Sequence, residues 1–420
     1  MEEGFVLSQL ITNNILKETQ DKFIRENNLS VEYSHSGKNF NYFVQDCVRD
    51  GKLNQSSLND FLFEELFFGY QRETYIYKVN SYDENKINPE IFLSCIKTLY
   101  SYVDSNMFNV IVNTIGNIED NELVAMRVIY NRTMTKITKV RLLFGKKVSI
   151  IRNRDNEKTI SYIPVEWNVG EKIVIVKVAP KRNLFDKTQK PENLNRVYVN
   201  KIGKIFDIGF EPFDNLHKEA ICEMCKDLYE QIYNKMVRAK PQGIDAFVET
   251  IAEQLKGRLE IEALELKATI NNIFNIKDSL QKQVENILIS NMLLDAELGG
   301  NLERIEGIVT YLKFNDGKEI SARLKGKQCR DPIFDSESYM ALRSAIESAQ
   351  RTSRLGVVWL EKFDRLRVAY DATDLECLNI HFYKNLSKEE FEYGLQMYWQ
   401  YEQRSYKKDN RLFALETKAQ

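Results

Sequence analysis

The sequence predicts an α+β protein with an acidic N-terminal helical unit, a basic antiparallel β-sheet or small barrel, central helices and a C-terminal α+β unit. Two observations support this order. Apolar residues recur at helical spacing in some regions and alternate with charged residues, as strands require, in others. The charge changes with this periodicity, because the helical regions are acidic and the strand-rich region is basic.

Residues 1–120 are expected to form the helical N-terminal domain. Apolar side chains repeat with helical spacing over residues 5–16 and 40–48, and Asn88 before Pro89 is typical of a helix start. A helix over 57–68 and a strand over 72–79 would also suit a winged-helix reader of DNA. That helix carries three acids and no base, so it would repel phosphate. A helical packing or protein-interaction unit is therefore favoured.

Residues 121–212 are expected to form the basic β-rich domain, because β-branched and aromatic residues alternate with charges there. Strands are predicted around residues 128–130, 140–142, 148–150, 160–162, 173–176 and 197–199. Turn-forming residues lie at Gly145, at 154–156, at 168–170 and at Pro180. One face of an antiparallel sheet can remain in solvent, and here that face would be basic.

Residues 213–300 are expected to be a helical segment and residues 301–420 a C-terminal α+β unit. The helical segment contains predicted helices over 214–240, 245–274 and 278–298. The last region opens with a predicted hairpin over 308–324. It continues with a helix over 336–351, strands over 357–360, 365–370 and 378–383, and a final helix that starts at the capping box of Ser387 and Glu390.

Positive charge is concentrated in residues 127–204, which contain 19 Lys and Arg but only six Asp and Glu in a chain of net charge −2. Such an excess costs stability through self-repulsion unless a partner neutralises it. A polyanion is one such partner, and the acidic helices on either side of the stretch are another. We expect binding of double-stranded DNA or RNA with little sequence preference, because the charge is directed at phosphates and no base-reading motif accompanies it.

The predicted phosphate contacts are Lys146, Lys147, Arg152, Arg154, Lys181, Arg182, Lys187 and Lys190. The last four belong to a long polar loop over residues 179–195, which we expect to become ordered on a phosphate backbone. Aromatic residues among the bases that face solvent could stack on single-stranded bases. The candidates are Tyr130, Phe144, Tyr162, Trp167, Phe185 and Tyr198.

Catalytic and metal sites receive little support from the sequence. It contains no GxxxxGK[ST], GxGxxG or GxSxG motif and only three histidines. Cys222 and Cys225, with His217 nearby, have the spacing of a metal pair, but their helical pattern predicts buried thiols. We therefore expect no cofactor and no metal, and no catalytic residue is identified.

Two alternatives to nucleic-acid binding remain open. One is an interaction subunit whose basic sheet docks an acidic protein or its own helices. The other is a metal-dependent nuclease that uses Asp316, Glu319 or Asp331, although Asp316 is simply explained as a turn residue.

The expected setting is the cytoplasm, without a membrane span. No run of about eighteen apolar residues occurs, and the few scattered cysteines are typical of a reducing compartment. The acidic helical parts are expected to hold a protein partner or a second copy of the chain. The Asn-, Lys- and Ile-rich composition is typical of an AT-rich genome, which suggests a prokaryotic defence or mobile-element system.

Overall fold

The computed structural model describes residues 7–69, 73–113, 122–152, 155–259, 276–297, 305–315, 321–327, 331–334, 336, 338–339, 342–343, 346, 349–363 and 365–416. The chain forms two compact units, Met1–Asp214 with Asp374–Leu395, and Asn215–Thr373 with Gln396–Gln420. The first contains the predicted N-terminal and basic β-rich regions. The α+β class is confirmed, and the strands form an antiparallel sheet that is open and not closed into a barrel.

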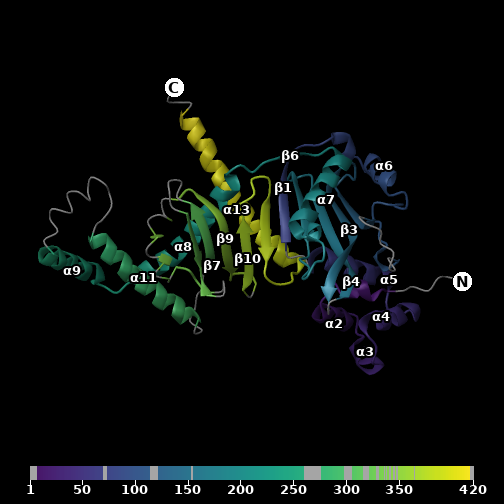
Figure 1. Ribbon diagram of the computed structural model, residues 1–420, viewed down its shortest axis with the longest axis horizontal. Coiled ribbons are helices and arrows are strands. Elements are labelled where there is room, and N and C mark those ends of the chain that lie inside the picture. The colour runs from purple at the N-terminus through teal and green to yellow at the C-terminus, as the bar shows by residue number, and fades with distance from the viewer. Residues whose placement is uncertain are drawn as a thin grey trace. The chain divides into compact units, whose positions relative to one another are not determined.

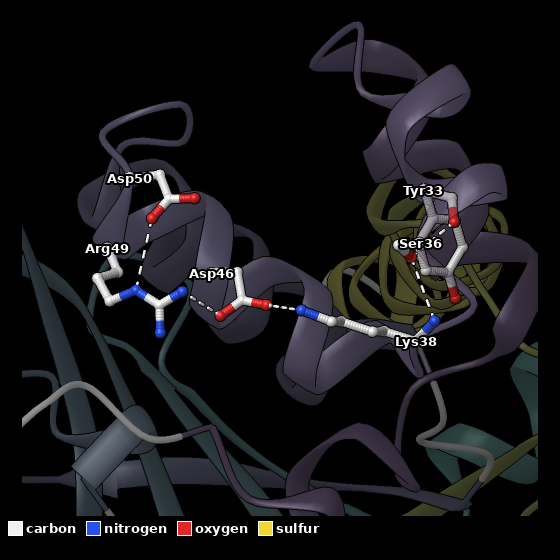
Figure 2. Close-up of polar contacts among 6 residues, drawn as sticks. All are labelled: Tyr33, Ser36, Lys38, Asp46, Arg49 and Asp50. Atoms are coloured by element: carbon white, nitrogen blue, oxygen red, sulfur yellow. Dashed lines mark hydrogen bonds and ion pairs between the residues drawn. The ribbon is translucent and has the colours of Figure 1, made fainter.

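The first unit begins with short helices. They are α1 Gln9–Thr12, α2 Lys17–Glu26, α3 Ser30–Ser36, α4 Phe40–Arg49, α5 Gln55–Glu64 and the π-helix η1 Glu65–Gly69. Figure 2 shows Asp46 of α4 between two cations, with Arg49 Nη2 at 2.6 Å from Asp46 Oδ1 and Lys38 paired with Oδ2. The hydrogen bond from Lys38 lowers the pKa of Asp46. These bases are thus neutralised locally.

The sheet of the first unit has the strand order β2-β3-β4-β5-β1-β11, and β6 pairs with the end of β1 (Figure 1). The strands are β1 Glu73–Ser81, β2 Glu122–Tyr130, β3 Ile137–Arg152, β4 Asp155–Asn168, β5 Ile173–Val178, β6 Gly209–Glu211 and β11 Leu378–Phe382. β3 and β4 form a long hairpin, paired from Lys139 with Asn168 to Arg152 with Asp155. β2 stops pairing at Gly145, so the rest of β3 extends past it.

One face of this sheet packs against α6 Pro89–Leu99 and α7 Pro191–Phe206 (Figure 1). The ring of Phe206 stacks on Phe92 at 4.9 Å and on Trp167 at 5.4 Å between centroids. Alternate residues of β3, including Phe144, point into the same core. α7 therefore closes the main hydrophobic core of the unit.

Two predictions in this region are wrong. The predicted strand at 197–199 lies inside α7, because Pro191 suits the first turn of a helix and Leu194, Tyr198 and Ile202 then share one buried helical face. The packing of that face overrides the β preference of the valines. The predicted turn at Gly145 is also wrong, since Gly145 lies within β3 and pairs with Glu122 and Tyr162.

The second unit contains the strand order β10-β9-β7-β8, with antiparallel pairing. Its strands are β7 Gly307–Asn315, β8 Ser321–Lys325, β9 Arg351–Trp359 and β10 Leu366–Asp371. Its helices include α8 Leu216–Ala239, α9 Ile244–Leu259 and α11 Ile276–Glu297, while α13 covers Lys388–Glu416. α8 packs on β9, where Lys226 Nζ donates to the Ala349 carbonyl at 2.6 Å. Much of the predicted helix over 336–351 lies outside the described residues, and its last residue, Arg351, starts β9.

The first testable consequence concerns α7. Phe206→Ala should destabilise the protein by about 3–5 kcal/mol, because the deleted ring leaves a cavity between α6 and the sheet. Val197→Ala on the same helix is the matched control: Val197 is 49% exposed, and its replacement should cost no more than about 0.5 kcal/mol. Urea unfolding followed by circular dichroism measures both. Equal effects of the two substitutions would contradict the role assigned to α7.

Candidate nucleic-acid interface

The end of β3 is bonded to the loop that follows β5. Ile150 and Leu184 form an antiparallel bridge. On either side of this bridge, the Ile151 amide donates to the Asn183 carbonyl at 2.8 Å and the Phe185 amide donates to the Ser149 carbonyl at 3.0 Å. The loop thus takes the place that β2 leaves empty beside β3.

Local hydrogen bonds hold the rest of this loop. Asp186 caps the 3-10 turn η4 Lys187–Gln189 by accepting from the Thr188 amide at 2.8 Å and from its hydroxyl at 2.6 Å. Gln189 accepts from the Ser149 amide at 3.1 Å, and Pro191 begins α7 directly afterwards. The sequence predicts ordering on a phosphate backbone, whereas in the structure the protein's own bonds fix the loop and end it at Pro191.

The pairing assigns side chains to two sides of the sheet, because opposite residues of an antiparallel pair point the same way and neighbours alternate. Phe185 lies opposite Ser149, which lies opposite Lys158 on β4. Lys147 and Ile151, two positions away along β3, share this side. Phe185 and Ile151 are 64% and 45% exposed, so this side faces solvent near the end of β3.

Four of the eight predicted contact residues have side chains that reach solvent here. Arg182, Lys187 and Lys190 are exposed and Lys147 is half-buried. Within the described part of the chain, none of the four forms an ion pair. Together with Lys158, which is also exposed, they are called the basic patch below.

Lys146 and Lys181 have other positions. Lys146 lies on the opposite side of β3 from Lys147, near Asp186 and Lys201. Lys181 is half-buried and donates to Asn14 Oδ1 at 2.7 Å, and burial lowers its pKa to about 8. Lys181 therefore anchors the N-terminal segment and is no part of the basic patch.

The two remaining predicted contacts are at the hairpin tip. Arg152 is the last residue of β3, and Arg154 lies outside the described residues.

The aromatic candidates separate clearly by burial. Phe144, Tyr162, Trp167 and Tyr198 are at most 1% exposed and belong to the interior, while Tyr130 is half-buried. Phe185 alone among the six is largely exposed.

Several other bases of residues 127–204 form ion pairs with acids of the protein itself. Arg141 Nε donates to Glu166 Oε2 at 2.7 Å, and Lys139 Nζ lies 3.3 Å from Glu166 Oε1. Arg127 reaches across to α5, where its guanidinium lies 2.6 Å from Asp60 and 2.9 Å from Glu64. The predicted pairing of these bases with acids of the N-terminal helices therefore exists in part.

Lys177 is the most deeply buried base of this group. Its Nζ lies 4.5, 3.9 and 3.8 Å from the ring centroids of Phe67, Phe68 and Phe391, and donates to the Phe67 carbonyl at 3.4 Å. Burial lowers the pKa of Lys177 to about 7. Burial alone would raise the pKa of Glu166, but its three neighbouring cations outweigh this and hold it below the usual value.

Two surface residues of the interface, Lys158 and Ile151, were not among the predicted contacts. Both follow from the register of the β3–β4 hairpin. The sequence places a turn at 154–156, whereas the strands pair as close to the tip as Arg152 with Asp155. With that register, period-two alternation alone puts Lys158, Ile151 and Lys147 on one side.

The residues considered for metal binding or nuclease activity do not form a site in the described parts of the chain. Asp316 and Glu319 lie outside the described residues. Cys222 and Cys225 are buried in α8, and burial raises the pKa of both thiols, which is typical of unreactive cysteines. Among the described residues, no three His, Cys, Asp or Glu side chains gather as metal ligands would.

Comparison with known proteins gives no family assignment. The sequence matches no protein-family model, and it has no significant match among curated proteins. None of the helices in the described ranges combines the length and apolar character needed to cross a lipid bilayer.

The buried Lys177 leads to a prediction about pH. Its pKa is about 7 in the folded protein against an ordinary 10.5, so the unfolded chain binds more protons between these values and stability must rise with pH there. From pH 7 to 9 this group alone should add about 2 kcal/mol to the free energy of unfolding.

Lys177→Met removes the titrating group and should flatten that rise. Lys204→Met, at an exposed position of α7, should leave it as in the wild type. Urea unfolding at several pH values provides the measurement. A Lys177→Met variant that keeps the full wild-type rise would show that another group produces it.

Proposed function

We propose that the protein binds nucleic acid by contacting phosphates through the basic patch of Lys147, Lys158, Arg182, Lys187 and Lys190. Binding shows little sequence preference, since lysine and arginine contacts to phosphate carry no base information. We infer that the protein alone has no nuclease and no nucleotide-hydrolysing activity.

The proposal rests on one observation. The loop carries positive charge that no ion pair neutralises in the described residues, and hydrogen bonds to the rest of the protein hold its backbone in place. Arg182, Lys187 and Lys190 project from a segment bonded to β3 on one side and to α7 on the other. Asp186 of the same loop is engaged by Thr188. Like charges held together in this way repel one another, and a polyanion relieves the repulsion while it releases its own counterions.

The interaction-subunit alternative draws support from a different set of bases. Arg127 bonds to Asp60 and Glu64, which is the internal pairing that this alternative requires. The same explanation does not extend to the basic patch, whose bases form no ion pair among the described residues. An acidic protein could still occupy the patch, and the binding experiment below separates the two ligands.

The proposal includes a setting and a second role. The protein would act in the cytoplasm, in a prokaryotic defence or mobile-element system, as composition favours. Its helical parts would hold a protein partner or a second copy. Phe247 of α9 and Ile287 of α11, 60% and 57% exposed, supply apolar surface for such a contact.

A triple neutralisation tests phosphate binding. The variant Arg182→Gln, Lys187→Gln, Lys190→Gln should bind a labelled DNA or RNA oligonucleotide more weakly. Its plot of log K against log salt should also be shallower, by roughly 2 to 3 in slope, because about 0.7 to 0.9 counterions are released per phosphate contact. Fluorescence anisotropy across a salt series measures both quantities.

The matched control is Arg132→Gln, Lys136→Gln, Lys172→Gln, which removes the same charge at exposed positions. Arg132 and Lys136 precede β3. At about 3.3 Å per residue, the start of β3 is roughly 40 Å along the strand from Ser149. This control should bind as the wild type does. Equal losses in both variants would show that only net charge matters. Wild-type affinity in the first variant, with tight binding of an acidic protein lost instead, would favour the interaction subunit.

The purified protein should not cleave DNA or RNA when Mg²⁺ or Mn²⁺ is added, because no complete catalytic set can be assembled from its residues. Incubation with labelled strands followed by gel electrophoresis provides the check. Cleavage that disappears in Asp316→Ala or Asp331→Ala but persists in Asp374→Ala would establish the metal-dependent nuclease in place of a binding protein.

A further inference from the structure

We propose that the basic patch prefers single-stranded nucleic acid to the duplex expected from the charge of the sequence, and that Phe185 stacks on an unpaired base. This inference rests on the proposed function and adds to it the form of the ligand. Salt bridges to phosphate alone would serve single strands and duplexes alike. An aromatic face is useful only where a base is free to leave its own stack.

The backbone hydrogen bonds of the loop fix the position of Phe185, and packing in the hydrophobic core does not. Its amide is tied to Ser149, which fixes the backbone, while 64% of the residue remains exposed. An apolar ring in solvent gains nothing for folding, because exposed aromatic surface is not removed from water. A stacked base would remove this surface from water.

The surroundings of the ring match a polynucleotide strand. Lys147 and Lys158 lie on the same side of the sheet as Phe185, and Arg182 and Lys187 flank it within the loop. Ile151 adds a second exposed apolar surface on the same side. Aromatic and apolar surface flanked by cations is the arrangement with which sequence-tolerant single-strand binders hold alternating bases and phosphates.

A duplex fits this surface less well. Its bases are stacked and paired, so their faces are covered and only its phosphates can meet the patch. Phe185 would then contribute nothing to binding a duplex, and this difference can be measured.

The experiment compares a labelled single strand of mixed sequence with its duplex of equal length, as DNA and as RNA. The wild type should bind the single strand more tightly. Phe185→Ala should weaken single-strand binding by about 5- to 150-fold, the range expected for loss of one stacked base, with an unchanged salt slope and little effect on duplex binding. Met134→Ala, which removes a 74% exposed apolar side chain before β3, should bind as the wild type does.

A conservative variant adds a direct readout. Phe185→Trp should restore single-strand affinity, and its indole fluorescence should be quenched on binding poly-dT beyond any change seen in the wild type. Thermal unfolding should show unchanged stability for both Phe185 variants, because the side chain is exposed.

The outcomes separate this inference from the proposed function. Wild-type single-strand affinity in Phe185→Ala, with affinity still lost in the triple Gln variant, would overturn stacking and leave phosphate binding in place. Equal losses on single strand and duplex, or tighter binding of duplex by the wild type, would also overturn it. If the triple Gln variant also binds like the wild type, both proposals fail.

Discussion

The buried pair of Arg141 and Glu166 decides how the charge of the β-rich region is divided. Two charges taken out of water cost several kcal/mol each, and this cost is offset only when their geometry and neighbours are favourable. Glu166 has three cations around it, and Arg141 lies 5.1 Å from the ring of Phe68 in η1. The sheet can therefore be covered on both faces although one of them is strongly charged.

β3 shows the result of this division along a single strand. Its odd-numbered residues begin as half-buried Lys139 and buried Arg141, which both pair with Glu166, and continue as half-buried Lys147 and exposed Ile151. Arg141 and Lys147, six residues apart and on the same side, thus have different surroundings. A count of charges along the sequence cannot distinguish them, because only the extent of the covering helices does so.

The sequence was sufficient for the fold class, for most strands and for the location of the basic loop. It was insufficient where packing outweighed local preference, as at Val197 in α7, and where a glycine was simply accommodated in a long strand, as at Gly145. The contact residues were predicted as a set, yet Lys181 is anchored to Asn14. Phe185 is distinguished from the other five aromatic residues by its exposure, which only the structure gives.

The loop beside β3 also has a protective effect. Past Gly145, β3 would present unpaired amides and carbonyls on a sheet edge that includes the apolar run of Ile150 and Ile151. Exposed edges of this kind pair readily with other chains. By occupying the edge, residues 183–185 prevent other chains from pairing with β3 there. Substitutions that detach the loop should accordingly reduce the yield of monodisperse protein.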